Sequence, residues 1–120
     1  MDLVHIFCCR NRFDSEEKLN RFVLATYSKD GDLIQSRFMR EIGLLDEYEP
    51  MAIEREYFHR PIDLLSALGG FSYSNQFRLV RVEPTDVDAV ICVYSPNVPS
   101  SPGKSTLEYV GAFVYNKNAG

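Results

Sequence analysis

The chain has 120 residues, 45% hydrophobic and 25% charged, a balance typical of one globular domain over 1–120 and not of a disordered chain. Its net charge of −4 and pI of about 5.1 disfavour a nucleic-acid-binding protein, which needs a basic face, and favour a basic partner. No apolar run approaches the roughly 18 residues of a membrane span, and the N-terminus lacks the features of a signal peptide, so we expect a cytoplasmic protein without membrane contact.

The first two elements are a strand over 3–10 and a helix over 15–28. Asp14 is the expected N-cap of the helix, and Glu17 would complete a capping box three residues later. Side chains at helical spacing predict a stripe that packs on a sheet: Leu19, Phe22, Val23, Thr26 and Tyr27.

A tight turn is predicted at Lys29–Asp32, because Asp-Gly readily adopts the positive φ that such turns need. An isolated Asp-Gly-Asp is not a calcium loop, which requires acidic positions spread over a longer loop and a closing glutamate. A short second helix follows over 36–42, with Gly43 as its end.

The most unusual charge distribution lies between Glu41 and Glu56, where six acidic residues accompany one base, Arg55. This run is either a solvated face or a docking surface for a basic protein. Its first half predicts an exposed loop that ends at Pro50, and its second half a strand over 52–58. Strand alternation places Ile53, Arg55 and Tyr57 on one face and Glu54, Glu56 and Phe58 on the other.

The next predicted element is a helix over 61–68 that begins at Pro61. The segment over 74–82 fits a helix capped by Ser74 or an alternating strand, and the local pattern leaves both open.

The longest apolar run lies in a predicted strand over 88–95, flanked on both sides by turn residues. A strand that is apolar on both faces belongs in the middle of a covered sheet. The last strand is predicted over 106–116, with Gly111 marking a bulge or a close backbone approach, and we expect these two strands to form a hairpin.

No catalytic or metal-binding constellation is evident. The three cysteines, Cys8, Cys9 and Cys92, lack a CxxC spacing, and adjacent residues of a strand point to opposite faces, so we expect reduced thiols and no zinc site. His5 and His59 stand alone, and the phosphate-loop, hydrolase and dinucleotide motifs are absent. We therefore expect no cofactor and no enzymatic activity; a small thiol enzyme is the least favoured alternative.

Four blocks in order resemble a family of bacterial polymorphic-toxin immunity proteins, the one numbered twenty-two: FDSEEKLNRFV, YSKDGDLIQSRFMREIGL, GGFSYSNQF and EYVGAFVY. The resemblance spans nearly the whole chain and favours a helix after Ser74. The first strand departs from it, since Phe7, Cys8 and Cys9 stand where the family typically has a tryptophan.

The resemblance implies a non-enzymatic α+β protein that neutralises a cognate toxin, frequently an HNH-like nuclease delivered between bacteria by contact-dependent or type VI secretion. The alternative is a regulatory or interaction domain with another basic protein partner. We expect an antiparallel sheet of about four strands, with three to four helices packed mainly on one face and the other face or an edge available to the partner.

An acidic surface can steer toward the basic cleft of a nuclease and occlude it, without direct contact with nucleic acid. Charge density and an aromatic anchor suggest the partner-binding residues: Asp30, Asp32, Glu41, Asp46, Glu47, Tyr48 and Glu49.

Overall fold

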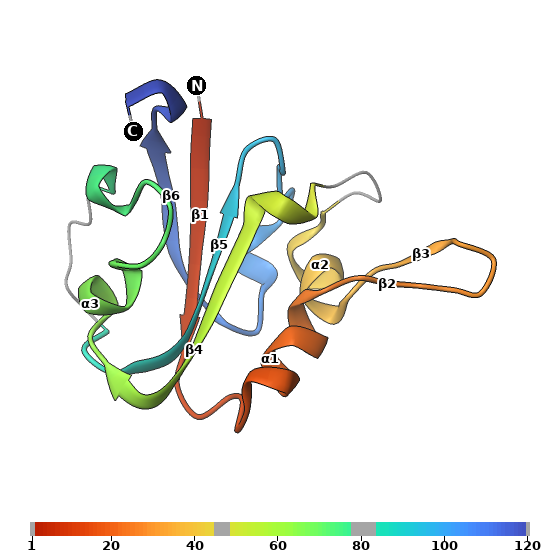
Figure 1. Cartoon of the computed structure of the whole chain (residues 1–120), viewed down its shortest axis with the longest axis horizontal. Helices are drawn as coiled ribbons and strands as arrows, with labels where there is room; N and C mark the ends of the chain where they lie inside the picture. Colours follow the sequence, from red (N-terminus) through yellow and green to blue (C-terminus); the bar gives the residue numbers. More distant parts are fainter. Residues whose placement is uncertain (1, 45–48, 78–83, 120) are drawn as a thin grey trace.

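The computed structural model describes residues 2–44, 49–77 and 84–119, which form an α+β fold. Its centre is a four-stranded antiparallel sheet in the order β4-β5-β1-β6 (Figure 1). The expected fold class and sheet are therefore confirmed. The strands are β1 (Asp2–Cys9), β4 (Ile53–Ile62), β5 (Val87–Tyr94) and β6 (Glu108–Tyr115).

The strand predicted over 88–95 is β5, and all eight of its residues are buried between β4 and β1. Its central place is confirmed. The predicted hairpin with the last strand is wrong, because β1 lies between β5 and β6 and pairs with both. β1 also buries side chains on both faces, among them Ile6 and Phe7. Central places for both apolar strands leave the more exposed β4 and β6 at the edges.

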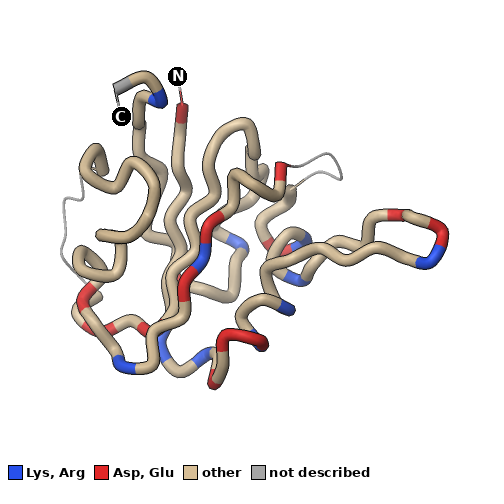
Figure 2. The backbone as a smooth tube through the Cα atoms, viewed as in Figure 1, with Lys and Arg blue, Asp and Glu red and all other residues tan. Residues whose placement is uncertain are grey.

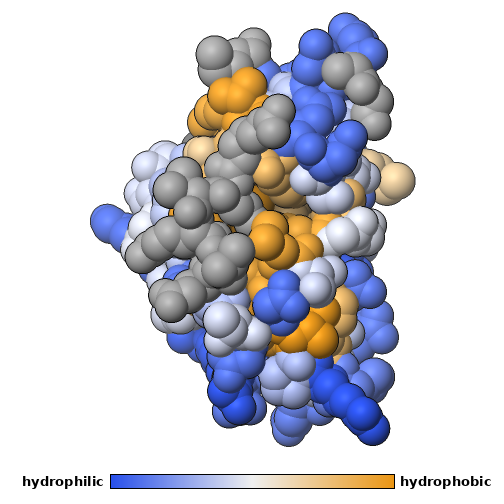
Figure 3. Space-filling view, turned by 90° about the vertical axis from the view of Figure 1, so that its left-hand side faces the viewer, coloured by the Kyte–Doolittle hydropathy of each residue, from blue (hydrophilic) through white to orange (hydrophobic). Residues whose placement is uncertain are grey.

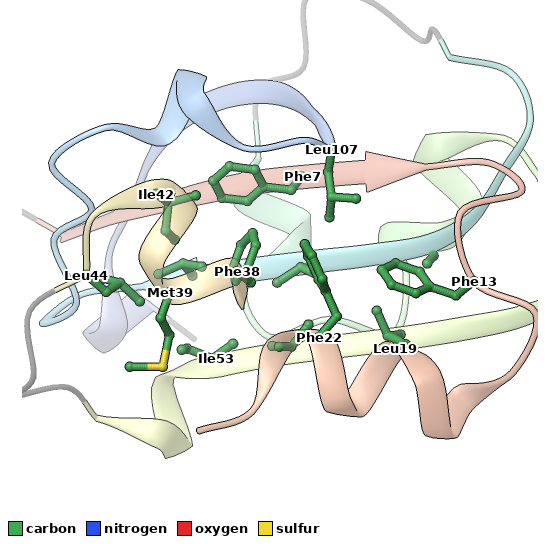
Figure 4. Close-up of a cluster of buried hydrophobic side chains, with 14 residues drawn as sticks. Phe7, Phe13, Leu19, Phe22, Phe38, Met39, Ile42, Leu44, Ile53 and Leu107 are labelled. Carbon is green, nitrogen blue, oxygen red and sulfur yellow. The ribbon is translucent and has the colours of Figure 1, made fainter. Parts of the chain in front are cut away.

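One face of the sheet is covered by α1 (Glu16–Val23) and α2 (Arg37–Ile42) (Figure 4). The ring of Phe38 lies at the centre of this cluster, 5.0 Å from the ring of Phe7 and 5.8 Å from that of Phe22 between centroids. The sheet side of this cluster includes alternate residues of β5: Ala89, Ile91 and Val93.

The opposite face is covered in part by α3 (Leu64–Leu68), which packs on the other alternate residues of β5. Among the described helices, two therefore lie on one face as expected, but the second face is not left open. Hydrophobic residues reach the surface on this side of the molecule (Figure 3), where Leu65 is exposed and Phe113 only partly buried.

α1 is shorter than predicted, and its cap is Ser15, whose hydroxyl accepts a hydrogen bond from the backbone amide of Lys18 at 3.2 Å. The expected cap, Asp14, instead pairs with the Lys18 ammonium at 2.8 Å. The helix ends at Val23, and the backbone of Leu24 is extended, so Thr26 and Tyr27 leave the predicted helical stripe. They form β2 (Thr26–Tyr27), which pairs with β3 (Leu33–Ile34).

The edge strands β6 and β4 contain Gly111 and Pro61, and only the prediction for Gly111 is confirmed. Gly111 lies at a register shift between β1 and β6 with φ of 146°, so the predicted bulge is confirmed. Pro61 does not begin a helix: it lies in β4, within an irregular part of the pairing with β5, where an edge strand tolerates its missing N–H. Asp63 caps α3 instead, accepting from the amide of Ser66 at 2.9 Å.

Four short 3-10 helices complete the described elements: η1 (Pro50–Ala52), η2 (Ser74–Gln76), η3 (Pro102–Lys104) and η4 (Lys117–Ala119). The segment predicted as a helix over 74–82 begins as η2, and the part from 78 onward lies outside the described residues.

Candidate functional site

A two-stranded arm, residues 26–34, extends away from the body of the molecule (Figure 1). The predicted turn closes it: the amide of Gly31 donates to the Ser28 carbonyl at 3.0 Å, and Gly31 has φ of 86°. Acidic and basic residues gather at its tip (Figure 2), where Asp30 and Asp32 are both exposed. The arm therefore carries two of the predicted partner-binding residues on a projecting surface.

Hydrophobic side chains accompany these carboxylates. Tyr27 is 64% exposed and Ile34 49% exposed, although both belong to strands of the arm. Strand residues are usually half-buried, so side chains this exposed on a projection are available to a partner.

The base of the arm is fixed by the body. Leu33 packs against the α1/α2 cluster, and the Ser36 hydroxyl donates to the Val23 carbonyl at 2.9 Å. The same hydroxyl accepts from the amide of Met39 at 3.1 Å and so caps α2. The arm thus emerges from a rigid junction between two helices.

Glu41 lies apart from this surface. Its side chain is only 13% exposed, and it accepts from Arg37 Nε at 2.9 Å and from the amide of Thr106 at 2.8 Å. The Thr106 hydroxyl is also within 3.0 Å of both carboxylate oxygens. Glu41 therefore holds the long connection before β6 against α2.

Glu49 is exposed and caps η1, since its carboxylate accepts from the amide of Met51 at 3.0 Å. The buried side chain of Asn97 bonds the backbone amide and carbonyl of Glu49, each at 2.9 Å. Glu49 is thus held in place. The other predicted residues of the acidic loop, Asp46, Glu47 and Tyr48, lie outside the described residues.

The second half of the acidic run follows the predicted alternation along β4. Ile53 and Tyr57 join the α1/α2 side, where Arg55 Nε donates to the Asn20 side chain at 2.6 Å. Phe58 packs on the α3 side, and Glu54 turns its carboxylate to the same side, toward Ser72.

Sequence reasoning missed a hollow in the surface on the α3 side, which we name the tyrosine hollow. Its volume is about 310 Å³, and its walls include Tyr73, Tyr94 and Tyr115, together with Glu49 and Glu54. The rings of Tyr73 and Tyr115 stack with centroids 4.8 Å apart, and the ring of Tyr94 stands perpendicular to Tyr115 at 5.5 Å. The only signal in the sequence is that β5 and β6 each end on a tyrosine.

Hydrogen bonds fix one wall of the hollow. Glu54 accepts from the Ser72 amide at 2.9 Å and from the Ser72 hydroxyl at 2.6 Å. The Tyr94 hydroxyl lies 2.7 Å from the same carboxylate and 2.8 Å from the Ser72 carbonyl. Burial raises the pKa of Tyr94, so its hydroxyl stays protonated and available to donate.

The residues that could carry thiol chemistry are poorly suited to it. Burial raises the pKa of Cys9 to about 12, and burial also raises the pKa of Cys8 and of Cys92. Thiols with raised pKa values hold little thiolate at neutral pH and are weak nucleophiles. His5 bonds the Tyr109 hydroxyl through Nδ1 at 2.9 Å, and burial lowers the pKa of its ring.

Within the described parts of the chain, no three His, Cys, Asp or Glu side chains are grouped so that they could hold a metal ion. Those parts also contain no helix that is long and apolar enough to cross a membrane.

The comparisons with known proteins give one match. The family model described as Immunity protein 22 matches residues 4–116, which is nearly the whole chain. No curated protein and no solved structure matches. The matched range includes β1 from Val4 onward, the other strands, the arm and the three tyrosines of the hollow. The chain therefore belongs to the Immunity protein 22 family and has the toxin-neutralising role of an immunity protein.

Proposed function

We propose that this protein neutralises a basic nuclease toxin, of HNH-like type, by covering its substrate cleft with an acidic surface. The surface consists of the tip of the arm, Asp30 and Asp32, and the acidic loop that contains Asp46, Glu47, Tyr48 and Glu49. The protein does this in the cytoplasm of the cell that makes it, where an incoming nuclease would reach the genome.

The observation that carries the proposal is the projecting arm. Its two tip carboxylates are exposed, and Tyr27 and Ile34 in the strands of the arm expose large hydrophobic surfaces. Charge at the tip would attract a basic partner over distance, while buried aromatic and aliphatic contacts would supply most of the affinity.

The overall charge of the chain supports a basic partner. With a net charge of −4, the protein attracts a cationic cleft and is repelled by nucleic acid. An inhibitor of this kind competes with the nuclease substrate for the same positive surface. Glu41 is left out of the proposed surface because Arg37 and Thr106 already bind its carboxylate.

The first test is a rescue assay. The toxin encoded beside this gene is expressed in a sensitive host with and without this protein, and the purified pair is then assayed for nuclease activity. We expect survival, a 1:1 complex and loss of DNA cleavage. Cell death in the presence of soluble protein would contradict the pairing, and a rescued toxin without nuclease activity would contradict the nuclease assignment.

The second test addresses the acidic surface. The double variant Asp46→Lys, Glu47→Lys should weaken the complex at low salt, with a smaller loss at high salt, because surface charges are screened. A matched control is Glu16→Lys, Glu17→Lys, which makes the same charge change at the exposed start of α1. Equal losses in both double variants would place the interface elsewhere.

A further inference from the structure

The tyrosine hollow presents aromatic surfaces from three distant parts of the chain. Tyr73 precedes η2 and adopts a left-handed backbone conformation with φ of 62°, while Tyr94 and Tyr115 end β5 and β6. The face of a tyrosine ring attracts a cation, because the ring quadrupole is negative above its plane. Tyr73 stacks on Tyr115 and is the more exposed of the three rings, so it gives the hollow an aromatic wall that favours positive charge.

Two carboxylates border these rings in fixed positions. Glu54 is held by Ser72 and Tyr94, and Glu49 is held by its hydrogen bond to the amide of Met51. The one cation in the described lining is Lys117, whose ammonium lies 4.0 Å from a carboxylate oxygen of Asp2. The charges facing the hollow thus favour a cation. Because hydrogen bonds already hold both carboxylates, binding costs little further side-chain entropy.

The Tyr115 hydroxyl is the independent sign of a missing ligand. Tyr115 is only 3% exposed, and its hydroxyl has no hydrogen-bond partner among the described residues. Ser95 also borders the hollow, and its backbone amide donates to the Leu3 carbonyl at 3.0 Å. A buried hydroxyl without a partner is costly, and an incoming N–H group would remove that cost.

We propose that the tyrosine hollow receives one arginine side chain of the toxin. A guanidinium is planar and can stack on a tyrosine ring while its N–H groups donate to Glu54, Glu49 and the Tyr115 hydroxyl. A lysine ammonium would gain the charge attraction but not the stacking. A volume of about 310 Å³ is large enough for one inserted side chain. This inference rests on the proposed function in that the arginine belongs to the toxin.

The chemistry of the hollow can be tested without the toxin. The full chain, labelled with ¹⁵N, is titrated with N-acetyl-L-arginine methylamide, and the amide resonances are followed by NMR. We expect saturable shifts at residues around the hollow, such as Ser72, Tyr73 and Ser95. The citrulline analogue, which has the same shape without the charge, should bind at least about tenfold more weakly. Equal binding of the citrulline or lysine analogue, or no saturable shift at these residues, would overturn the proposal.

Two conservative variants locate the binding groups. Tyr115→Phe removes only the hydroxyl, and Glu49→Gln removes a charge while keeping an oxygen that can cap η1. Each should weaken arginine binding about fivefold, the effect of one hydrogen bond. Tyr57→Phe, on the other face of the sheet, is the matched control and should leave it unchanged. Unchanged binding in both hollow variants would also overturn the proposal.

The same variants connect the hollow to the toxin. If the wild-type protein binds the toxin, Tyr115→Phe and Glu49→Gln should each weaken that complex about fivefold. A wild-type complex that Tyr115→Phe forms with unchanged affinity would overturn the inference and leave the proposed function intact, because Tyr115 lies outside the proposed acidic surface. A wild-type protein that binds arginine but not the toxin would overturn the proposed function. It would also show that the arginine bound in the hollow does not come from the toxin.

Discussion

The arm and the tyrosine hollow use similar residues in opposite ways. Tyr27 on the arm is 64% exposed, whereas Tyr115 in the hollow is 3% exposed. Asp30 at the tip of the arm is exposed, whereas Glu54 in the hollow is bound by Ser72 and Tyr94. Exposed charges on a projection raise the rate of association with an oppositely charged partner. Fixed groups in a hollow select one chemical group of that partner by direct contact.

The two regions also differ in what they contribute to folding. The hollow is built from the ends of β5 and β6 and shares side chains with the core, whereas the arm contacts the core mainly through Leu33. We therefore expect changes in the hollow to affect stability as well as binding, and changes at the tip of the arm to affect binding alone.

The largest effect is expected from Tyr94→Ala. This change removes a buried ring from β5 and leaves Glu54 and the Ser72 carbonyl without their shared partner, so the free energy of unfolding should fall by about 3–5 kcal/mol. Chemical denaturation followed by circular dichroism measures it. Tyr94→Phe is the control, since it keeps the ring and should cost only about 1 kcal/mol. A loss below about 1 kcal/mol for the alanine variant would mean that the hollow is not part of the core.

The next effect concerns binding through the arm. The double variant Asp30→Lys, Asp32→Lys should lower the association rate with the toxin about tenfold at low salt, and much less at high salt, because exposed charges steer encounter and are screened. Stopped-flow or surface-based kinetics at two salt concentrations measure this rate. The dissociation rate should change less. An unchanged association rate at both salt concentrations would remove the arm from the proposed surface.

The contrast between the two regions also explains what the sequence could predict. The turn at Lys29–Asp32 and the helix that Ser36 caps depend on neighbouring residues, and the structure has both. The order of the strands depends on how β1 and β5, which both bury side chains on two faces, share the centre of one sheet, and no local pattern contains that information. The predicted hairpin failed for that reason.

The candidate site shows the same limit. Charge density suggested Asp30 and Asp32 as partner-binding residues, and their exposure follows from a local turn. It also suggested Glu41, but Thr106, which binds the Glu41 carboxylate, is 65 residues away in the sequence. The tyrosine hollow joins residues 73, 94 and 115. Pairing of β5 and β6 with β1 brings Tyr94 and Tyr115 to the same end of the sheet, and the segment between α3 and η2 brings Tyr73 to them.

A smaller and opposite effect is expected from Tyr115→Phe in the free protein. The hydroxyl is buried without a partner among the described residues, so its removal should raise the free energy of unfolding by about 1 kcal/mol. The melting temperature and chemical denaturation both report this gain. A variant that gains stability while losing arginine affinity would show that the hydroxyl is retained for binding. A loss of stability would mean that the hydroxyl has a partner within the fold.

The smallest effect on stability is expected on the arm, from the double variant Tyr27→Ala, Ile34→Ala. The change removes two large side chains, yet both are mostly exposed, so the free energy of unfolding should change by less than about 0.5 kcal/mol. Thermal unfolding of this variant beside Tyr94→Ala compares the two regions directly. A loss above about 1 kcal/mol would show that these side chains pack on the body. An unchanged stability would show that Tyr27 and Ile34 have no role in folding, which leaves both side chains free to contact the toxin.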